Sequence, residues 1–242
     1  MVSYRDINSK IFYRILRKKA LSVYTPAGAA DYRLSDVDYY NFSKGRGKLA
    51  FVHDAAWSYP KPTILDMGCG TGRYFHCCDN AKSIVAFDLS HSMLLEAKKP
   101  IAGAKAPVVL INSSLDEVEF KRLSFDLVYC MGVFGCVLPL DDSILIKVAR
   151  WLKPGGAFCF DVIQGYVEPS QGTWRSRLAE KIQPYLFGPA KAYVDAKLMG
   201  FTIDRPGLDA LVSERFEKVE IQEFAGRGRM DLLCMARIEG IR

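Results

Sequence analysis

Residues 63–73 constrain the fold of this 242-residue chain most strongly. They begin with a short apolar run, which is typical of a strand buried in a parallel sheet. Gly68, Gly70 and Gly72 follow at alternate positions, and glycine lets a ligand approach the backbone closely. A strand that leads into a glycine-rich turn and then a helix predicts the cofactor site of an open α/β sheet.

The spacing of the glycines distinguishes this stretch from two other nucleotide-binding loops. The dinucleotide fingerprint Gly-x-Gly-x-x-Gly needs its third glycine at position 73, which is Arg73. A phosphate-binding P-loop needs Gly-Lys-Ser or Gly-Lys-Thr, which does not follow here. At this point a glycine-rich turn without a ligand remains the alternative.

Residues 66–72, Asp-Met-Gly-Cys-Gly-Thr-Gly, resemble motif I of the class I S-adenosylmethionine-dependent methyltransferases, Asp-x-Gly-x-Gly-x-Gly. The resemblance implies that Asp66 orients the methionine amino group of the cofactor through the loop. The backbone of the loop would then line the methionine part of S-adenosylmethionine. The loop residues implied to bind the cofactor are Gly68, Cys69, Gly70 and Gly72.

A second apolar run, residues 83–88, ends in Asp88, which lies 20 residues after Gly68. The end of the neighbouring strand is where an acid reaches the ribose of an adenosine cofactor. A carboxylate accepts hydrogen bonds from both ribose hydroxyls. A surface aspartate at a strand end is the alternative. The resemblance adds that Leu89 and Met93 flank the adenine ring.

The stretch after the third predicted strand, residues 108–111, departs from the family pattern. The family usually has an aspartate here that accepts a hydrogen bond from the adenine amino group, and this chain has Ser114 in that place. A serine hydroxyl can still accept a hydrogen bond, and the Leu115 backbone can contact the ring. Asn112 or Asp116 are alternative partners for the adenine.

The fourth predicted strand, residues 125–130, resembles motif II. The resemblance implies that Cys130 and Met131 bind the cofactor and that residues 131–134 face the transferred methyl group. Family members that methylate base amino groups or glutamine amides carry Asn/Asp-Pro-Pro-Tyr here. This chain does not, which disfavours those acceptors. Residues 152–156 closely resemble the Leu-Lys-Pro-Gly-Gly turn of the family.

The first 60 residues predict a helical extension or lid. Residues 3–19 carry apolar side chains at helical spacing. Residues 25–33 predict a loop, because they contain Pro26 and Gly28, and residues 45–47 predict a break between two helices. Ser35 is a candidate cap for the first of these helices. Tyr39 and the tyrosine after it weakly resemble an aromatic pair that closes over the methionine moiety, with core packing as an equal alternative.

The positive charge is concentrated at the same end of the chain. The net charge is +6, and residues 1–63 hold 11 Lys and Arg against 5 Asp and Glu. The remaining residues hold 22 of each and are neutral. Such asymmetry can indicate a nucleic-acid or membrane contact. A dimer arm, a lid or a solvated helix face are the alternatives, and the short run of charge favours a packed helix or lid.

Composition places the chain among cytoplasmic globular proteins. Half of its residues are apolar, and the longest apolar run, residues 127–140, is too short to span a bilayer. The N-terminus lacks the apolar core of a signal peptide. The seven cysteines form no Cys-x-x-Cys pair, which predicts buried thiols in a reducing cytoplasm and no metal site.

Together these patterns predict an α/β protein with a doubly wound, mostly parallel seven-stranded sheet and helices on both faces. The resemblance supplies the strand order 3-2-1-4-5-7-6, with the last strand antiparallel. Residues 1–60 are the predicted extension and residues 61–242 the methyltransferase domain. A substrate cap is expected at residues 164–205.

The sequence favours an S-adenosylmethionine-dependent methyltransferase that acts on an oxygen or nitrogen atom of a small molecule and releases S-adenosylhomocysteine. The sulfonium is already an activated leaving group, so the protein mainly supplies alignment and exclusion of water. None of the three histidines has an evident acidic partner, and we assign no catalytic residue. The alternatives are an RNA methyltransferase that uses the basic N-terminal segment and a non-catalytic cofactor-binding module. No membrane partner is expected, and an oligomer is compatible with the sequence.

Overall fold

The computed structural model describes residues 10–41, 43–166, 202–226 and 229–239. The helices are α1 (Lys10–Val23), α2 (Pro26–Asn41), α3 (Ser43–Trp57), η2 (Phe75–Cys78, a 3-10 helix), α4 (His91–Ile101), α5 (Asp142–Trp151) and α8 (Arg205–Ser213). The strands are β1 (Thr63–Met67), β2 (Ser83–Asp88), β3 (Val108–Asn112), β4 (Phe125–Phe134), β5 (Leu152–Tyr166), β6 (Lys218–Gly226) and β7 (Arg229–Arg237).

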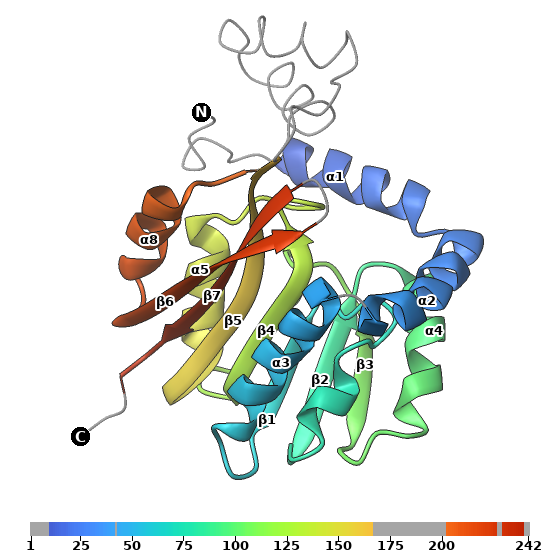
Figure 1. The fold of residues 1–242 in the computed structure, drawn as a ribbon, viewed down its shortest axis with the longest axis horizontal. Coiled ribbons are helices and arrows are strands. Elements are labelled where there is room, and N and C mark those ends of the chain that lie inside the picture. The colour runs from blue at the N-terminus through green and yellow to red at the C-terminus, as the bar shows by residue number, and fades with distance from the viewer. Residues whose placement is uncertain (1–9, 42, 167–201, 227–228, 240–242) are drawn as a thin grey trace, which may run out of the picture.

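The seven strands form one sheet in the order β3-β2-β1-β4-β5-β7-β6 (Figure 1). The first five strands run parallel to one another, and β7 is antiparallel to both β5 and β6. The predicted fold class, strand order and antiparallel last strand are therefore confirmed.

Helices cover both faces of the sheet, and each face has its own apolar core. Ile64 and Leu65 are consecutive in β1, so their side chains point to opposite faces. Ile64 packs in the core under α3 and α4, with Val52 and Leu94. Leu65 packs in the core under α5 and α8, with Ile144. An apolar run without alternation is what a strand buried on both faces requires.

The loop predicted for residues 25–33 is wrong, because α2 begins at Pro26. Proline is well tolerated at the first position of a helix, where its missing N–H group would have no helical partner. The Thr25 hydroxyl oxygen accepts a hydrogen bond from the Gly28 amide at 3.2 Å and satisfies one free donor of the first turn. Ser35, the predicted cap, lies inside the helix, where its hydroxyl donates to the Tyr32 carbonyl at 2.6 Å.

The break predicted at residues 45–47 is also wrong, because α3 runs through these positions. Gly47 faces Phe224 of β6 so closely that a Cβ atom at Gly47 would lie 2.2 Å from the phenyl Cζ. The glycine therefore serves close packing between α3 and β6.

Several predicted boundaries shift by a few residues. The predicted helix of residues 3–19 extends to Val23, and its predicted start at Ser3 lies outside the described residues. α4 includes Pro100 as its second-last residue. α8 begins at Arg205, because the Asp204 carboxylate accepts a hydrogen bond from the Gly207 amide at 2.9 Å and caps the helix. Most of the substrate cap predicted at 164–205 lies outside the described residues.

The cysteines carry free thiols, and five of the seven are buried. Burial raises the pKa of the Cys159 thiol to about 12, so it stays protonated near neutral pH. Among the residues that the structure describes, no helix is both long and apolar enough to cross a membrane.

Candidate functional site

A pocket lies between α1 and residues at the carboxyl ends of the central strands. Figure 1 shows α1 passing across that end of the sheet. The space between the walls of the pocket is about 860 Å³, part of it open to solvent. Met67 of β1, Phe87 of β2 and Cys130 of β4 line one side, and Leu16 and Ala20 of α1 line the other. In open α/β sheets, ligands bind at this edge of the sheet.

Two of the predicted loop residues, Gly68 and Gly70, line the pocket. Their φ angles of +70° and +54° lie in the left-handed region that favours glycine. A Cβ atom on Gly70 would meet nothing within 4 Å, so the backbone there faces open space. The Gly68 amide donates to the Phe87 carbonyl at 2.9 Å and fixes the loop to the end of β2. This is a cradle in which a ligand can lie against the main chain.

The other predicted loop residues, Asp66, Cys69 and Gly72, face the protein interior instead of the pocket. The Tyr129 hydroxyl donates to the Asp66 carboxylate at 2.9 Å. Burial raises the pKa of Asp66 well above its ordinary value, and the hydrogen bond from Tyr129 opposes that rise. A Cβ atom on Gly72 would lie 2.4 Å from the Phe75 ring. These residues shape the loop from below.

Asp88 lies at the pocket with each carboxylate oxygen fixed by a backbone amide. The Gly70 amide donates to Oδ2 at 2.9 Å, and the Ser90 amide donates to Oδ1 at 2.8 Å. Burial raises the pKa of Asp88, and these two hydrogen bonds oppose the rise. Each carboxylate oxygen has a second lone pair. The Asp88 carboxylate can therefore accept hydrogen bonds from a diol in the pocket while it also binds the backbone of the glycine loop.

The predicted adenine-side residues Leu89, Met93, Ser114 and Leu115 all line the pocket. The Ser114 hydroxyl donates to Glu117 Oε2 at 3.0 Å. The alternative partner Asn112 is used elsewhere, since its side-chain amide donates to the carbonyls of Asp88 and Leu89, each at 2.9 Å.

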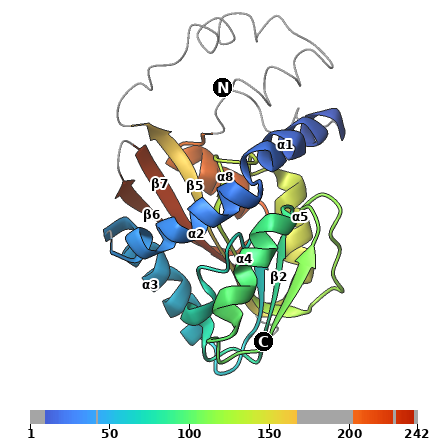
Figure 2. The ribbon, with the colours of Figure 1, turned by 90° about the vertical axis from the view of Figure 1, so that its right-hand side faces the viewer.

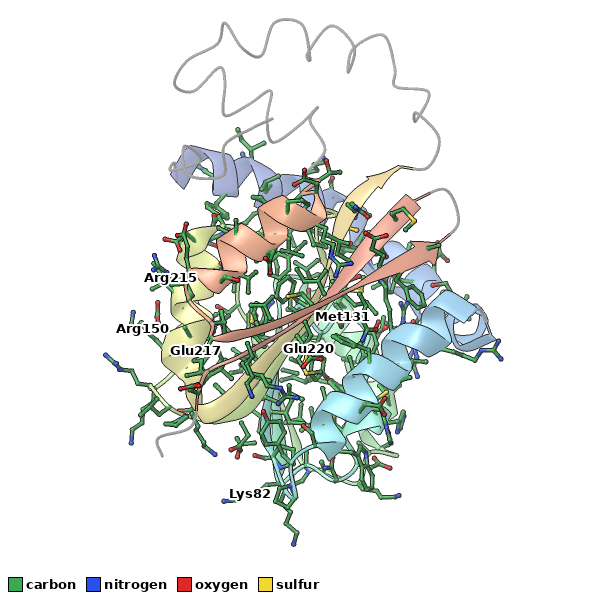
Figure 3. The ribbon with its side chains drawn as sticks, turned by 60° about the vertical axis from the view of Figure 1, so that its left-hand side comes forward. Lys82, Met131, Arg150, Arg215, Glu217 and Glu220 are labelled. Carbon is green, nitrogen blue, oxygen red and sulfur yellow. The ribbon has the colours of Figure 1, made fainter. Side chains whose placement is uncertain are left out.

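Cys130 and Met131, in the second half of β4, also line the pocket and are buried. In Figure 3, Met131 lies in the interior of the molecule, whereas Lys82, just before β2, lies at its lower edge. Gly132 follows with a φ of +78°, and its amide donates to Asp161 Oδ1 at 2.5 Å. The Asp161 carboxylate thus fixes the backbone where the pocket wall turns.

Lys48 of α3 forms an ion pair with Asp161, and the sequence did not predict this contact. The Lys48 ammonium contacts Asp161 of β5 and lies 2.7 Å from Asp231 of β7. All three side chains are buried. The signal in the sequence was that each of these three charged residues lies within an apolar stretch, which indicates a buried charge that needs a partner.

Asp36 of α2 was also missed, although it supports the glycine loop. Its carboxylate accepts a hydrogen bond from the Thr71 hydroxyl at 2.8 Å and another from Arg73 Nε at 2.6 Å. The Arg73 guanidinium lies over the Tyr32 ring, 4.8 Å from its centroid, in cation–π geometry. A buried arginine directly after the loop requires a carboxylate, which was the available signal.

α1 is fixed over the pocket by polar contacts of its first half, and Figure 2 shows α2 continuing from it along α4. The Tyr13 hydroxyl donates to Asp141, the cap residue of α5. Arg17 binds Asp116 through two nitrogens and lies 2.6 Å from Glu117 Oε1. These contacts bring the N-terminal helix to the sheet end as a second wall of the pocket.

Comparison with known proteins identifies the domain. Residues 64–156 match a family model described as a methyltransferase domain. A tRNA U34 carboxymethyltransferase of Cellvibrio japonicus is 32% identical over 107 residues, which are 41% of this chain and 32% of the relative. A malonyl-[acyl-carrier protein] O-methyltransferase of Enterobacter lignolyticus is 29% identical over 163 residues, 63% of this chain and 61% of the relative. The chain thus spans about one third to three fifths of the length of these relatives.

A solved structure shows the same fold over nearly the whole chain. The 1,6-didemethyltoxoflavin-N1-methyltransferase of Burkholderia thailandensis, with bound S-adenosylhomocysteine, matches 99% of this chain and 92% of its own at 17% identity, with a TM-score of 0.65. The glycine cradle and the partly buried Asp88 carboxylate of the present pocket fit an adenosine cofactor that carries a diol. The chain therefore contains a class I S-adenosylmethionine-dependent methyltransferase domain, whose cofactor is S-adenosylmethionine.

Proposed function

We propose that this protein transfers a methyl group from S-adenosylmethionine to an oxygen or nitrogen atom of a small molecule. The observation that carries the proposal is one pocket that joins the Gly70 backbone, the Asp88 carboxylate and Met131 to an apolar region closed by α1. In such a transfer the acceptor lone pair forms a bond to the methyl carbon, the bond electrons stay on sulfur, and S-adenosylhomocysteine leaves.

The residues on the cofactor side have separate roles in this proposal. Asp88 accepts hydrogen bonds from the ribose hydroxyls, because its carboxylate is fixed in the pocket by two backbone amides. Gly70 gives the methionine part access to the main chain, because nothing occupies the space that a Cβ atom would take. Leu89 and Met93 provide apolar surface on the adenine side.

The acceptor side lies between α1 and the segment after β4. Val133 near the end of β4 and Val137 and Leu138 in the segment after it line one side, and Leu16 lines the other from α1. Apolar walls exclude water from the reacting atoms. This lining suits a small organic acceptor, and α1 and α2 form the lid over it.

Tyr13 lines the acceptor side but does not serve as the base. Burial raises its pKa far above the ordinary value, and the negative charge of Asp141 adds to the rise. The phenol therefore remains protonated at neutral pH. Alignment of a nucleophile that loses its proton easily is sufficient for such a transfer, so no residue is given a catalytic role.

An RNA acceptor is the second candidate, and it is favoured by the exposed Arg14 and Lys18 on α1 and by the excess positive charge of residues 1–63. Part of that charge is neutralised within the fold. Arg17 pairs with Asp116 and Glu117, and Lys48 is buried with two aspartates. The remaining charge is modest for a protein that binds a polyanion, which supports the small-molecule acceptor.

Calorimetric titration with S-adenosylhomocysteine, with NAD as the control ligand, tests the cofactor site. Wild type should bind the former only, and Asp88→Ala should lose that binding. Asp54→Ala serves as the matched control, because Asp54 is an exposed aspartate of α3. Binding of NAD, or equal affinity in wild type and Asp88→Ala, would refute the site.

Turnover then distinguishes the acceptors. Methyl transfer to small hydroxyl or amine compounds that persists in high salt supports the proposal. Transfer to RNA that falls steeply with added salt would favour the second candidate. Tight cofactor binding without transfer to any nucleophile would indicate a non-catalytic module.

A further inference from the structure

β4 leaves its regular pairing with β5 beside the pocket. The two strands pair at Cys130 and Phe160, and pairing resumes at Phe134 only after a shift of register. Residues 131–133 of β4 therefore stand opposite a single residue of β5, Asp161. We call residues 131–133 the β4 bulge. Bulges are common next to active sites, where they redirect a strand and its side chains.

The β4 bulge lies between the cofactor side and the acceptor side of the pocket, and all three of its residues line the pocket. Val133 packs against the glycine loop, since a Cβ atom added to Gly68 would lie 2.6 Å from Val133 Cγ2. Gly132 has a φ of +78°, and a Cβ atom there would meet nothing within 4 Å. The bulge therefore touches the cofactor loop and leaves open space in front of Gly132.

Asp161 supplies the hydrogen bond that holds the β4 bulge to β5. Its side chain is buried behind the pocket wall. Oδ1 accepts a hydrogen bond from the Gly132 amide at 2.5 Å, while Oδ2 contacts the Lys48 ammonium. Because both oxygens are engaged at once, the carboxylate cannot turn without losing one of these contacts. The position of Gly132 is thus coupled to a buried cation on α3.

We propose that Asp161 is a positioning residue for methyl transfer, because it sets the β4 bulge against which the acceptor lies in line with the methyl carbon and the sulfur. The inference rests on the proposed function, since it assumes that the acceptor occupies the open space in front of Gly132. Asp161 does not line the pocket and acts through Gly132. A misplacement of about 1 Å can cost about 100-fold in rate, so the effect falls on turnover.

Steady-state kinetics of Asp161→Ala test this role, with S-adenosylmethionine and the small hydroxyl or amine compound that wild type methylates fastest. The kcat should fall by about 10- to 100-fold. The Kd of S-adenosylhomocysteine, measured by calorimetry, should stay close to that of wild type, because Asp88 and Gly70 follow other strands. Asp161→Asn should have an intermediate kcat, since its single side-chain oxygen can serve Gly132 or Lys48 but not both.

Asp231→Asn is the matched control. Asp231 is also buried and lies 2.7 Å from the same Lys48 ammonium, whereas the Gly132 amide donates to Asp161. The control weakens the same buried ion cluster, yet its kcat should stay close to that of wild type. Lys48 keeps one carboxylate partner in Asp161→Ala and in the control alike. Circular dichroism melting of each variant reports on the fold.

The results separate this inference from the proposed function. An equal loss of kcat in Asp161→Ala and Asp231→Asn would assign the effect to the ion cluster as a whole and overturn the inference. An unchanged kcat in Asp161→Ala, or cofactor affinity that falls in parallel with turnover, overturns it as well, and the proposed function then stands. If Asp161→Ala does not fold, Asp161→Asn is judged by the same comparisons. A wild type that methylates none of the compounds overturns the proposed function and the inference with it.

Discussion

Arg73 and Asp36 form a buried ion pair that joins the glycine loop to α2, with Nη2 2.5 Å from Oδ1. Both side chains are largely inaccessible to solvent, and Asp36 also accepts the Thr71 hydroxyl. The loop is therefore supported by a helix that lies before the strands in the sequence. A buried charge that loses its partner is strongly unfavourable.

Asp36→Ala should lower the free energy of unfolding by about 3–5 kcal/mol, the cost of breaking a buried ion pair by removing one partner. It should also weaken S-adenosylhomocysteine binding, because the loop loses its support from α2. Urea denaturation and calorimetry measure the two effects. Asp31→Ala, on the exposed surface of the same helix, is the control and should change neither. Equal stability of the two variants would contradict a supporting role for Asp36.

Lys48→Met should destabilise the protein by about 3–5 kcal/mol, because two buried carboxylates then lose their shared cation. Adding Asp231→Asn to this variant should recover part of the loss, since one of the two uncompensated charges is removed. Chemical denaturation of the single and double variants gives the coupling between the sites. Strictly additive losses would show that the two side chains do not act as a unit.

Gly47→Ala should destabilise the protein even though alanine favours a helix by about 1 kcal/mol over glycine. The added methyl would overlap the Phe224 ring, and overpacking of this kind costs about 1–3 kcal/mol. Phe224→Leu in the same chain should restore part of the stability. Gly103→Ala is the control, because its nearest contact would be an ordinary 3.5 Å. A Gly47→Ala variant more stable than wild type would refute the contact.

Asp66→Asn should change how stability depends on pH. Burial raises the folded-state pKa of Asp66 above its unfolded value, so the folded protein binds more protons. The free energy of unfolding therefore decreases as the pH rises from the ordinary pKa of an aspartate, which applies to the unfolded chain, to the raised pKa of Asp66 in the folded protein. Denaturation of wild type and variant between pH 5 and pH 9 measures the difference. The free energy of unfolding of the variant should rise relative to that of wild type as the pH rises. A difference in unfolding free energy that does not change with pH would contradict the raised pKa of Asp66.

The five parallel strands could be predicted because they contain contiguous apolar runs, and β6 because its apolar and polar residues alternate. The glycine loop and Asp88 could be predicted because they lie within short motifs. The helices before them could not be delimited, because Pro26 and Gly47 resemble helix breakers when only their neighbours are considered. Pro26 is in fact a first-turn residue and Gly47 a packing contact. Both roles depend on geometry that local sequence does not contain.

Most of the predicted cofactor-side residues line the pocket, whereas Asp66, Cys69 and Gly72 lie beneath the glycine loop, and no α1 residue was among the predicted site residues. Leu89 and Ser114 were placed by their distance along the chain from recognisable strands. Tyr13 and Arg17 line the same pocket only because their helix docks on residues far along the chain. An amphipathic pattern indicates that a helix has a buried face, but it does not indicate which surface covers that face.

The docking of α1 has a consequence for protein synthesis. Arg17 bonds to Asp116, 99 residues later, and Tyr13 bonds to Asp141, 128 residues later. A ribosome adds about 5–20 residues per second, so α1 emerges several seconds before either partner has been made. During that time its apolar face has no sheet to cover. Closure of the pocket is thus a late event in the maturation of the nascent chain.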